Sequence, residues 1–371
     1  FHTMQSRQSC AGKTLSAKNQ HTKHRSSLKL KGEKMKENII SRVPLKIYRR
    51  LRWEINQRKT YKQIKSNYGK TYADICYESE KAIFLNRSKT EVLAALKKKD
   101  EYIIGDIERK CSSVISSSDA YRVTVSKSRR VDEPIWVFWW TGEETAPEIV
   151  KACIKSIRRN ANGHRVIFLS KDNLHDYVTL PDFIEKKHND GNIGHAHYSD
   201  IVRISLLAEY GGVWIDSTVF ISQPIPDYLF SERFYTARSV DNEAFYFSRS
   251  RWVGYFIAGA KVFPLFAFVR DMLFSYWKVT DSIIAYLLLD YLFDIACRYL
   301  PEVADTINAL PNNNLLRGEL MTRRNEPFSA ELFDRLEHGD TFLSKLSWRY
   351  GSPVAITKEG KKTNYGHIIE L

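Results

Sequence analysis

Pro134-Ile-Trp-Val-Phe-Trp-Trp140 is a run of aromatic and branched residues, and this composition predicts a short buried strand. A helix is expected over residues 147–160, and Arg165-Val-Ile-Phe-Leu169 predicts a second buried strand. Strand, helix and strand at these lengths form a βαβ unit with parallel strands, so we expect an α/β fold. Ligands of such sheets bind beyond the carboxyl ends of the strands. At the end of the first strand stand Trp139, Trp140, Thr141 and Gly142.

A further strand end carries an acidic residue. Ser199 is the expected cap of a helix that stops at Gly211, a residue type that tolerates the left-handed closing turn. Val213-Trp-Ile215 then predicts a strand that leads directly to Asp216. A carboxylate in this position suits a hard cation such as Mg²⁺ or Mn²⁺, which neutralises the charge that develops on a diphosphate leaving group.

Asp200 and Arg203 lie three residues apart on one face of that helix, at the end nearest to the expected cleft. An isolated pair of this kind is most often an ion pair on the surface. Their spacing from Asp216 favours a second interpretation, in which all three side chains belong to one ligand site.

The segment that holds these residues is Tyr198-Ser-Asp-Ile-Val-Arg203 followed by Leu206-Leu-Ala-Glu-Tyr-Gly-Gly-Val-Trp-Ile-Asp-Ser-Thr-Val219. It resembles bacterial capsular polysaccharide synthesis glycosyltransferases. More distantly, it is similar to the yeast outer-chain mannosyltransferases and the sugar-transferring clostridial toxins. The likeness extends over most of residues 135–350 and includes Phe138-Trp-Trp-Thr-Gly-Glu143, Lys151-Ala-Cys-Ile-Lys-Ser-Ile157, Leu289-Asp-Tyr-Leu-Phe293 and Lys345-Leu-Ser-Trp348.

The resemblance implies a GT-A fold, in which a Rossmann-like mixed sheet with helices on both faces is joined to an acceptor-binding half. It implies that Asp200 and Arg203 contact the donor, and that Asp216 binds a metal through the diphosphate. Ser347-Trp348 is expected to close over the phosphates, with Lys345 adding positive charge. Trp139 or Trp140 is expected to stack on the base, unless it is buried as part of the strand. The other implied donor-binding residues are Thr141, Gly142, Gly212 and Ser217.

One departure from the family pattern concerns the metal. The common Asp-x-Asp motif is Asp216-Ser217-Thr218 in this chain, so one metal-binding carboxylate is missing. The expected ligands of Mn²⁺ or Mg²⁺ are then Asp216 and the hydroxyl groups of Thr218 and Ser347. The departure leaves open whether the chain is an active enzyme or a catalytically silent protein of the same fold.

Two other groups of residues are candidates for chemistry. Gly191-Asn-Ile-Gly-His-Ala-His197, with His188 nearby, is either a loop that shapes the donor pocket or a metal cluster, and the lack of a clear third ligand favours the loop. Asp290 and Asp294 lie one turn apart on an apolar helix, where a charge is costly unless it is used or paired. Asp290 is therefore a candidate catalytic residue that faces a sugar, with pairing inside the fold as the alternative.

The basic charge of the chain is concentrated in its first 70 residues, which hold 19 Lys and Arg against 3 Asp and Glu. The remaining residues hold 38 basic and 40 acidic side chains. Apolar residues at four-residue steps predict a basic amphipathic helix near residues 39–65, namely Ile39, Val43, Ile47, Leu51 and Ile55. This helix either packs on the catalytic domain or rests on an anionic membrane surface. Nucleic acid is not an expected partner, because no recognised motif accompanies the charge.

We expect three regions: a disordered leader over residues 1–34, a basic helical region over 35–130 and a catalytic domain over 131–371. Met35 is an alternative biological start, which would make the leader non-native. The five scattered cysteines form no C-x-x-C pair and fit a reducing cytoplasm. No stretch offers the roughly 20 apolar residues of a spanning helix, and the chain begins without a signal-peptide core. We therefore expect a cytoplasmic protein, peripheral on the inner face of the plasma membrane if the basic helix binds lipid.

These features together predict a hexosyltransferase that moves a sugar from a UDP-sugar to a surface or capsular polysaccharide acceptor carried on a lipid. Retention of configuration is favoured, because no carboxylate stands out as an inverting general base and the resemblance points to retaining enzymes. One alternative is a sugar-phosphate transferase of capsule synthesis, which would leave phosphodiester links in its product. The other is a catalytically silent scaffold, because Thr218 replaces the second carboxylate.

Overall fold

The computed structural model describes residues 45–122, 133–241 and 245–371, and it separates into two compact units. The first unit contains the described residues up to Ile103 together with Ile284–Tyr286, and the second contains the others. The predicted leader over residues 1–34 and the predicted boundary at residue 130 lie outside the described residues. Both therefore stay predictions.

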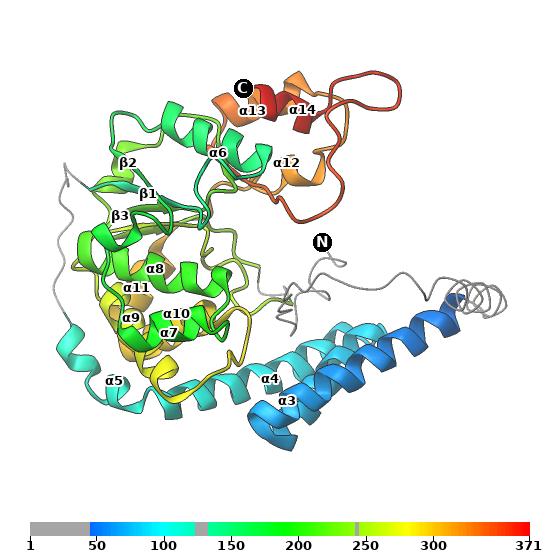
Figure 1. The fold of residues 1–371 in the computed structure, drawn as a ribbon, viewed down its shortest axis with the longest axis vertical. Helices are drawn as coiled ribbons and strands as arrows, with labels where there is room; N and C mark the ends of the chain where they lie inside the picture. Colours follow the sequence, from blue (N-terminus) through cyan, green and yellow to red (C-terminus); the bar gives the residue numbers. More distant parts are fainter. Residues whose placement is uncertain (1–44, 123–132, 242–244) are drawn as a thin grey trace, which may run out of the picture. The chain divides into compact units, whose positions relative to one another are not determined.

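The elements of the second unit follow one another as strands and helices in alternation at first, and then mainly as helices (Figure 1). Its strands are β1 (Ile135–Phe138), β2 (Val166–Leu169), β3 (Gly212–Ile215), β4 (Val219–Ile221), β5 (Phe234–Thr236), β6 (Phe256–Gly259) and β7 (Leu343–Lys345). Its helices after β1 are α6 (Glu148–Arg159), α7 (Asp182–Asn189), α8 (His195–Tyr210), α9 (Pro264–Val279), α10 (Leu288–Tyr299), α11 (Pro301–Ala309), α12 (Glu319–Thr322), α13 (Ala330–His338) and α14 (Asn364–Glu370).

Shorter elements complete the described chain. The 3₁₀ turns are η1 (Ser118–Tyr121), η2 (Leu174–Asp176) and η3 (Asp227–Phe230). Ahead of β1 lie α3 (Leu45–Phe84), α4 (Lys89–Lys110) and α5 (Ser112–Ser116). The division between the two units falls inside α4.

Five strands form one mixed sheet in the order β2-β1-β3-β6-β5. β1 runs parallel to both β2 and β3, and Trp136 lies opposite Ile167 on one side and Trp214 on the other. β6 runs antiparallel to β3 and to β5, while β4 and β7 form a separate antiparallel pair. The βαβ unit predicted from residues 134–169 is confirmed, and so is the α/β class with a mixed sheet. The assignment to the GT-A fold itself stays a prediction.

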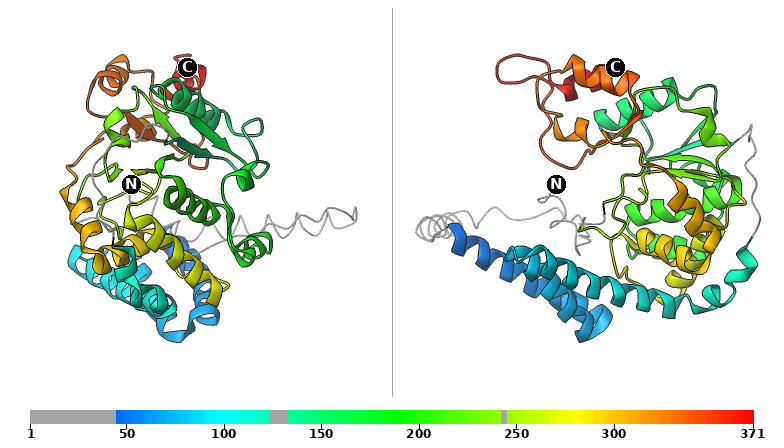
Figure 2. Two further views of the ribbon diagram at one scale, coloured as in Figure 1. Left: turned by 90° about the vertical axis from the view of Figure 1, so that its left-hand side faces the viewer. Right: turned by 180° about the vertical axis from the view of Figure 1, so that it is seen from behind.

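Helices cover both faces of the sheet because its side chains alternate in direction. Ile135 and Val137 of β1 belong to a buried cluster that includes the inward face of α6. The intervening Trp136 points the other way, and its ring lies 5.5 Å from that of Tyr210 at the end of α8. Figures 1 and 2 show α6 on one side of the sheet and α8 to α11 on the other. The runs of buried residues that predicted the strands therefore reflect burial on two faces.

The turn from α8 into β3 depends on two glycines. Gly211 has a φ of 71° and Gly212 a φ of 95°, which are backbone conformations that side chains with a Cβ rarely adopt. A Cβ on Gly212 would also lie 2.3 Å from the carbonyl oxygen of Pro134. The predicted end of the helix at Gly211 is confirmed. The predicted start is wrong, because α8 begins at His195 and Ser199 lies within it.

The first unit contains a helical hairpin. Gly69 in α3 has a φ of 84° and a ψ of 171°, so the helix is interrupted there. Trp53 stacks on Phe84 at 4.5 Å, and the Tyr61 hydroxyl donates to Asp74 at 2.6 Å. Because these pairs are nearly symmetric about Gly69, the two halves of α3 run antiparallel to each other.

The helix is confirmed from residue 45 onward, but the predicted apolar stripe does not face the hairpin. Ile47, Leu51 and Ile55 are each more than half exposed, whereas Ile64 is buried and Trp53 is half-buried. The aromatic residues fill the space between the two helices, so the four-residue repeat is left on the outer side. Ile39 and Val43 lie outside the described residues.

The most apolar part of the chain forms packed helices of the second unit. α9 buries Phe266, Val269, Leu273 and Trp277 along one side. α10 carries Asp290 and Asp294 on an otherwise largely buried surface. Over the described ranges, no helix combines the length and the hydrophobicity that a membrane crossing requires.

Candidate active site

Asp216 lies where the chain leaves the main sheet. It follows β3 directly, and its backbone N–H donates to the carbonyl of Tyr255 at 2.9 Å. Its carbonyl accepts from the N–H of Val219 at 2.9 Å, so residues 216–219 form a tight turn that leads into β4. The side chain of Asp216 is 25% exposed. The carboxylate is thus fixed at a strand end and remains accessible, as predicted.

Both oxygens of the Asp216 carboxylate accept charged hydrogen bonds. Oδ1 accepts from Nη2 of Arg203 at 3.0 Å and from Nε1 of Trp214 at 2.9 Å. Oδ2 accepts from Nζ of Lys345 at 2.8 Å. Burial alone would raise the pKa of this carboxyl group, but the charges of Lys345 and Arg203 outweigh it and lower the pKa to about 2. Asp216 is therefore an anion at neutral pH.

Arg203 connects Asp216 to Asp200. Its Nη1 lies 2.9 Å from Oδ1 of Asp200, and its side chain is only 6% exposed. The guanidinium also lies 5.0 Å from the ring of Trp214. A Cβ on Gly254 would lie 2.8 Å from Nη1, so this glycine leaves the space that the guanidinium occupies. The structure thus brings Asp200, Arg203 and Asp216 together, while their contacts with a donor stay predictions.

A second row of side chains holds Asp200. Nε1 of Trp277 donates to Nε2 of His197 at 2.8 Å, so this nitrogen of the imidazole is the unprotonated one. The other nitrogen, Nδ1, then carries the proton and lies 3.4 Å from Oδ2 of Asp200. No local sequence signal indicates this link, because Trp277 comes from α9 and lies 80 positions further along the chain.

Lys345 reaches the site from the second sheet. β7 pairs with β4 so that Lys345 lies opposite Val219, close to the turn that follows Asp216. Its Nζ lies 2.7 Å from Oγ1 of Thr218 as well as 2.8 Å from Asp216, and 4.9 Å from the centre of the Tyr255 ring. The positive charge that the resemblance placed here is therefore in contact with the motif itself.

The residues expected to hold a divalent ion do not fit one in this arrangement. The ammonium group of Lys345 already bridges the carboxylate of Asp216 and the hydroxyl of Thr218. Oγ of Ser347 accepts from the N–H of Arg349 at 3.2 Å, while Ser217, which was expected to contact the donor, is buried. Within the described parts of the chain, no three His, Cys, Asp or Glu side chains gather as a metal-binding group would. Metal binding therefore stays a prediction.

The aromatic residues after β1 take different positions. Trp139 packs edge-on against the exposed Trp348 at 5.6 Å. Trp140 is half-buried among Tyr198, His188 and His195 and lies beyond the end of β1, so burial within the strand is wrong for it. The N–H of Gly142 donates to the carbonyl of Trp139, which makes a turn that leaves Thr141 exposed.

The histidines near α8 form a pair. Nε2 of His188 lies 2.9 Å from Nδ1 of His195, and the His188 ring stacks on Tyr198 at 3.8 Å. Burial lowers the pKa of His188 to about 4 and also lowers that of His195. His195 and His197 lie in α8, so the predicted loop is wrong for these two residues, and the pocket-shaping role stays a prediction.

Asp290 and Asp294 have different partners. Asp294 forms ion pairs at 2.8 Å with Arg251 and with Arg298, which is the pairing inside the fold that the sequence left open. Asp290 accepts a hydrogen bond from Nε1 of Trp252 at 2.9 Å. Burial and, less strongly, the charge of Asp200 raise the pKa of Asp290 to about 7, against the lowering effect of the Trp252 hydrogen bond. Asp290 is thus a carboxyl group that gains or loses its proton near neutral pH.

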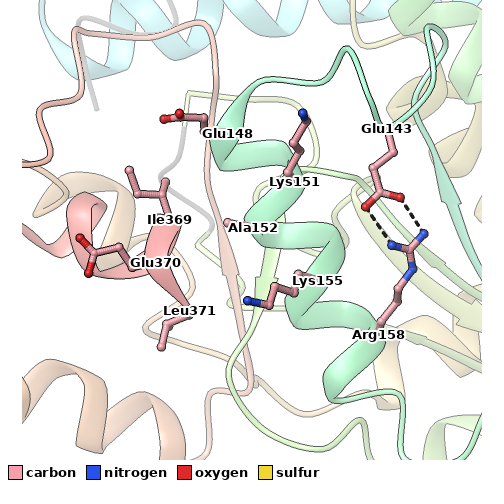
Figure 3. A pocket seen from close by; sticks show the side chains of 9 residues that line it. All are labelled: Glu143, Glu148, Lys151, Ala152, Lys155, Arg158, Ile369, Glu370 and Leu371. Atoms are coloured by element: carbon pink, nitrogen blue, oxygen red, sulfur yellow. Dashed lines mark hydrogen bonds and ion pairs between the residues drawn. The ribbon is translucent and has the colours of Figure 1, made fainter.

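A separate pocket lies between α6 and α14 (Figure 3). Lys151 and Lys155 line it from α6, and the end of the chain lines it from the other side. The pocket is lined by as many acidic as basic side chains. Oε2 of Glu143 forms an ion pair with Nη2 of Arg158 at 2.7 Å. None of its lining residues belongs to the Asp216 site. It therefore offers no support for the predicted chemistry.

A model of the family described as capsular polysaccharide synthesis protein matches residues 81–368, a range that includes every side chain of the Asp216 site. The chain belongs to this family. The chain is also similar to the O-glycosyltransferase braB of Annulohypoxylon truncatum, with 33% identity over 105 residues. The alignment covers 26% of this chain and 25% of the relative, so the chain spans about a quarter of the length of that protein. No solved structure matches.

Proposed function

We propose that this capsular polysaccharide synthesis protein is a glycosyltransferase that takes a sugar from a nucleotide-diphosphate donor, with UDP as the first nucleotide to test. One observation carries the proposal: an ionised Asp216 stands at a strand end and is fixed by Arg203 and Lys345. The match with the family and the similarity to an O-glycosyltransferase support the same reaction class.

The chain's own residues supply binding, orientation and proton transfer in this proposal. Asp216 and Asp200 hold Arg203 and Lys345 at the place where the diphosphate would bind. The exposed Trp348 beside Trp139 offers an aromatic surface for the base. Asp290, with a pKa near 7, is the candidate that exchanges a proton with a sugar hydroxyl. We propose a retaining, same-face transfer to a glycan acceptor.

A screen of purified full-length protein against nucleotide sugars tests the proposal. Release of the free nucleotide is measured for UDP-, GDP- and dTDP-sugars, with Asp216→Asn as the comparison. A donor labelled in its β-phosphate separates sugar transfer from sugar-phosphate transfer. The label leaves with the nucleotide in the first reaction and enters the product in the second. The proposal is wrong if wild type and variant release no nucleotide from any donor.

A catalytically silent binding protein is the second candidate. It is favoured by one observation, which is that both oxygens of Asp216 already have cationic partners in the structure. In this case a nucleoside diphosphate binds to the wild-type protein, yet no donor is consumed. Calorimetry of binding, run beside the turnover screen, distinguishes the two candidates.

We also propose that the acceptor is carried on lipid and that the first unit binds an anionic membrane surface. Ile47, Leu51 and Ile55 are exposed in a line on α3. The same face continues toward the basic Arg58 and Lys62, both of which are exposed. An apolar stripe among basic residues suits a helix that lies in the headgroup region, where each Lys or Arg contributes about 1 kcal/mol.

Vesicle co-sedimentation measures this binding. We expect vesicles that contain phosphatidylserine to bind the protein and neutral phosphatidylcholine vesicles to leave it in solution, with binding weakened by salt. Leu51→Glu should reduce binding about tenfold or more. Ile83→Glu is the matched control, because it places the same charge at an exposed apolar residue elsewhere in the hairpin. Equal binding by both variants would exclude the stripe as the membrane contact.

A further inference from the structure

We propose that the ammonium group of Lys345, in place of a divalent cation, supplies the positive charge that binds the donor's diphosphate and stabilises it as it leaves. This inference rests on the proposed function, because it names the group that recognises the donor of that reaction. It differs from the expectation drawn from the family resemblance, in which Asp216, Thr218 and Ser347 hold Mn²⁺ or Mg²⁺.

The contacts of Lys345 occupy the expected metal position. Its Nζ lies 2.8 Å from Oδ2 of Asp216 and 2.7 Å from Oγ1 of Thr218, and these are two of the oxygens expected to bind the ion. The remaining carboxylate oxygen accepts from Arg203 and Trp214. A metal on Oδ2 would have to share that oxygen with an ammonium group, and like charges at such a distance repel each other strongly.

The charge balance of the motif supports the same conclusion. Thr218 in place of a second aspartate removes one negative charge, and Lys345 adds one positive charge. Compared with a motif of two carboxylates and no lysine, the site is more positive by two charges. A bound Mg²⁺ or Mn²⁺ would supply the same difference. Thr218 thus weakens a metal site, and Lys345 supplies the positive charge that the metal would otherwise provide.

Lys345 is also the cation that a ligand can reach. Its side chain is 30% exposed, whereas that of Arg203 is 6% exposed and packed against Trp214. A lysine carries its charge on a flexible four-carbon chain, so Nζ can turn from Asp216 toward a phosphate oxygen. Asp216 keeps its partner Arg203 during this movement, so its negative charge remains compensated.

The transfer step then balances without a metal. The bond between the sugar C1 and the β-phosphate oxygen breaks, and its electron pair stays on that oxygen. The acceptor hydroxyl oxygen forms the new bond to C1, and its proton passes by way of Asp290 to the departing phosphate. Lys345 donates hydrogen bonds to the diphosphate throughout, and these become stronger as negative charge develops on the leaving group.

Calorimetric titration with UDP, GDP and dTDP tests the inference independently of turnover. The full chain is titrated once with EDTA and once with MnCl₂. We expect the wild-type protein to bind one nucleotide with the same affinity in both. Lys345→Met should weaken binding in EDTA about 30-fold or more, because a charge-assisted contact is lost. Lys345→Arg should retain most of the affinity. Lys151→Met, an exposed lysine in the pocket of Figure 3, is the matched control and should bind as the wild type does.

The effect of Mn²⁺ on the nucleotide affinity of the Lys345→Met variant distinguishes the ammonium group from a metal most directly. With the ammonium removed, Oδ2 of Asp216 and Oγ1 of Thr218 lose their cation, so we expect Mn²⁺ to restore part of the lost affinity. Thermal unfolding of each variant shows whether it is folded. If the wild type binds nucleotide only with Mn²⁺, the inference is wrong and the proposed function stands. If no nucleotide binds under either condition, the proposed donor class is wrong as well.

Discussion

Asp216 and Asp290 are two half-buried aspartates of one unit, and each accepts a hydrogen bond at 2.9 Å from a tryptophan indole. Their acidities nonetheless differ greatly. The pKa of Asp216 is lowered to about 2, because Lys345 and Arg203 outweigh its burial, whereas burial raises that of Asp290 to about 7. The charged partners in direct contact therefore decide which carboxyl group is an anion and which can exchange a proton at neutral pH.

The largest effect is expected for Asp216→Asn. The amide removes the negative charge that Arg203 and Lys345 share, which leaves Arg203 with Asp200 and Lys345 with the hydroxyl of Thr218, so the arrangement of the two cations is lost. Transfer should fall about 10² to 10³-fold, as for other preorganised charged groups. Nucleotide release from the best donor measures it. Asp334→Asn on α13 is the matched control at a largely exposed position, and an equal loss there would remove the distinction between the two sites.

A smaller effect is expected for Asp290→Asn, and it depends on pH. The folded protein holds the proton of Asp290 up to about pH 7, well above the usual range of an aspartate. The stability that comes from this proton is fully present below about pH 4 and is lost as the pH rises through 7. The variant should therefore be more stable than the wild type at pH 8, by about 1 to 3 kcal/mol after allowing for solvent screening.

Chemical unfolding at pH 5 and pH 8 gives this difference, and the pH profile of turnover adds a second test. If Asp290 exchanges the proton in transfer, the variant loses the limb of the profile near pH 7. If the variant is more stable at pH 8 but its pH profile of turnover still shows the limb near pH 7, Asp290 has only a structural role.

The smallest effect is expected for Gly254→Ala, which reaches Asp216 only through Arg203. The added Cβ would lie 2.8 Å from Nη1 of Arg203, so the guanidinium must shift by some tenths of an ångström. Since the mutated residue is not charged, we expect about a tenfold loss of transfer and a loss of stability of about 1 kcal/mol. Gly194→Ala is the matched control, because a Cβ there meets no atom within 4 Å. Equal losses in the two variants would show that the position of Arg203 is not critical.

Much of the framework around Asp216 is predictable from local sequence. The helix predicted to end at Gly211 carries Asp200 and Arg203, and the strand predicted over Val213–Ile215 leads directly to Asp216. Alternation along β3 also places Trp214 on the same side as Asp216, which explains their hydrogen bond. The apolar stripe of α3 was less informative. The period of the stripe indicates a helix. Whether the stripe or the side with Trp53 is buried depends on the residues that pack against it from the other half of the hairpin.

The sequence alone determines which residues are ionisable and which segments form strands, because these depend on side-chain chemistry and on short-range periodicity. It does not determine which cation meets Asp216. Lys345 lies 129 positions away along the chain, and only the pairing of β7 with β4 brings its ammonium group to that carboxylate. Arg251 meets Asp294 and Trp252 meets Asp290 in the same way, through loops whose path depends on packing. The tertiary structure therefore decided the acidity of both aspartates, since electrostatic energy depends on distances in space.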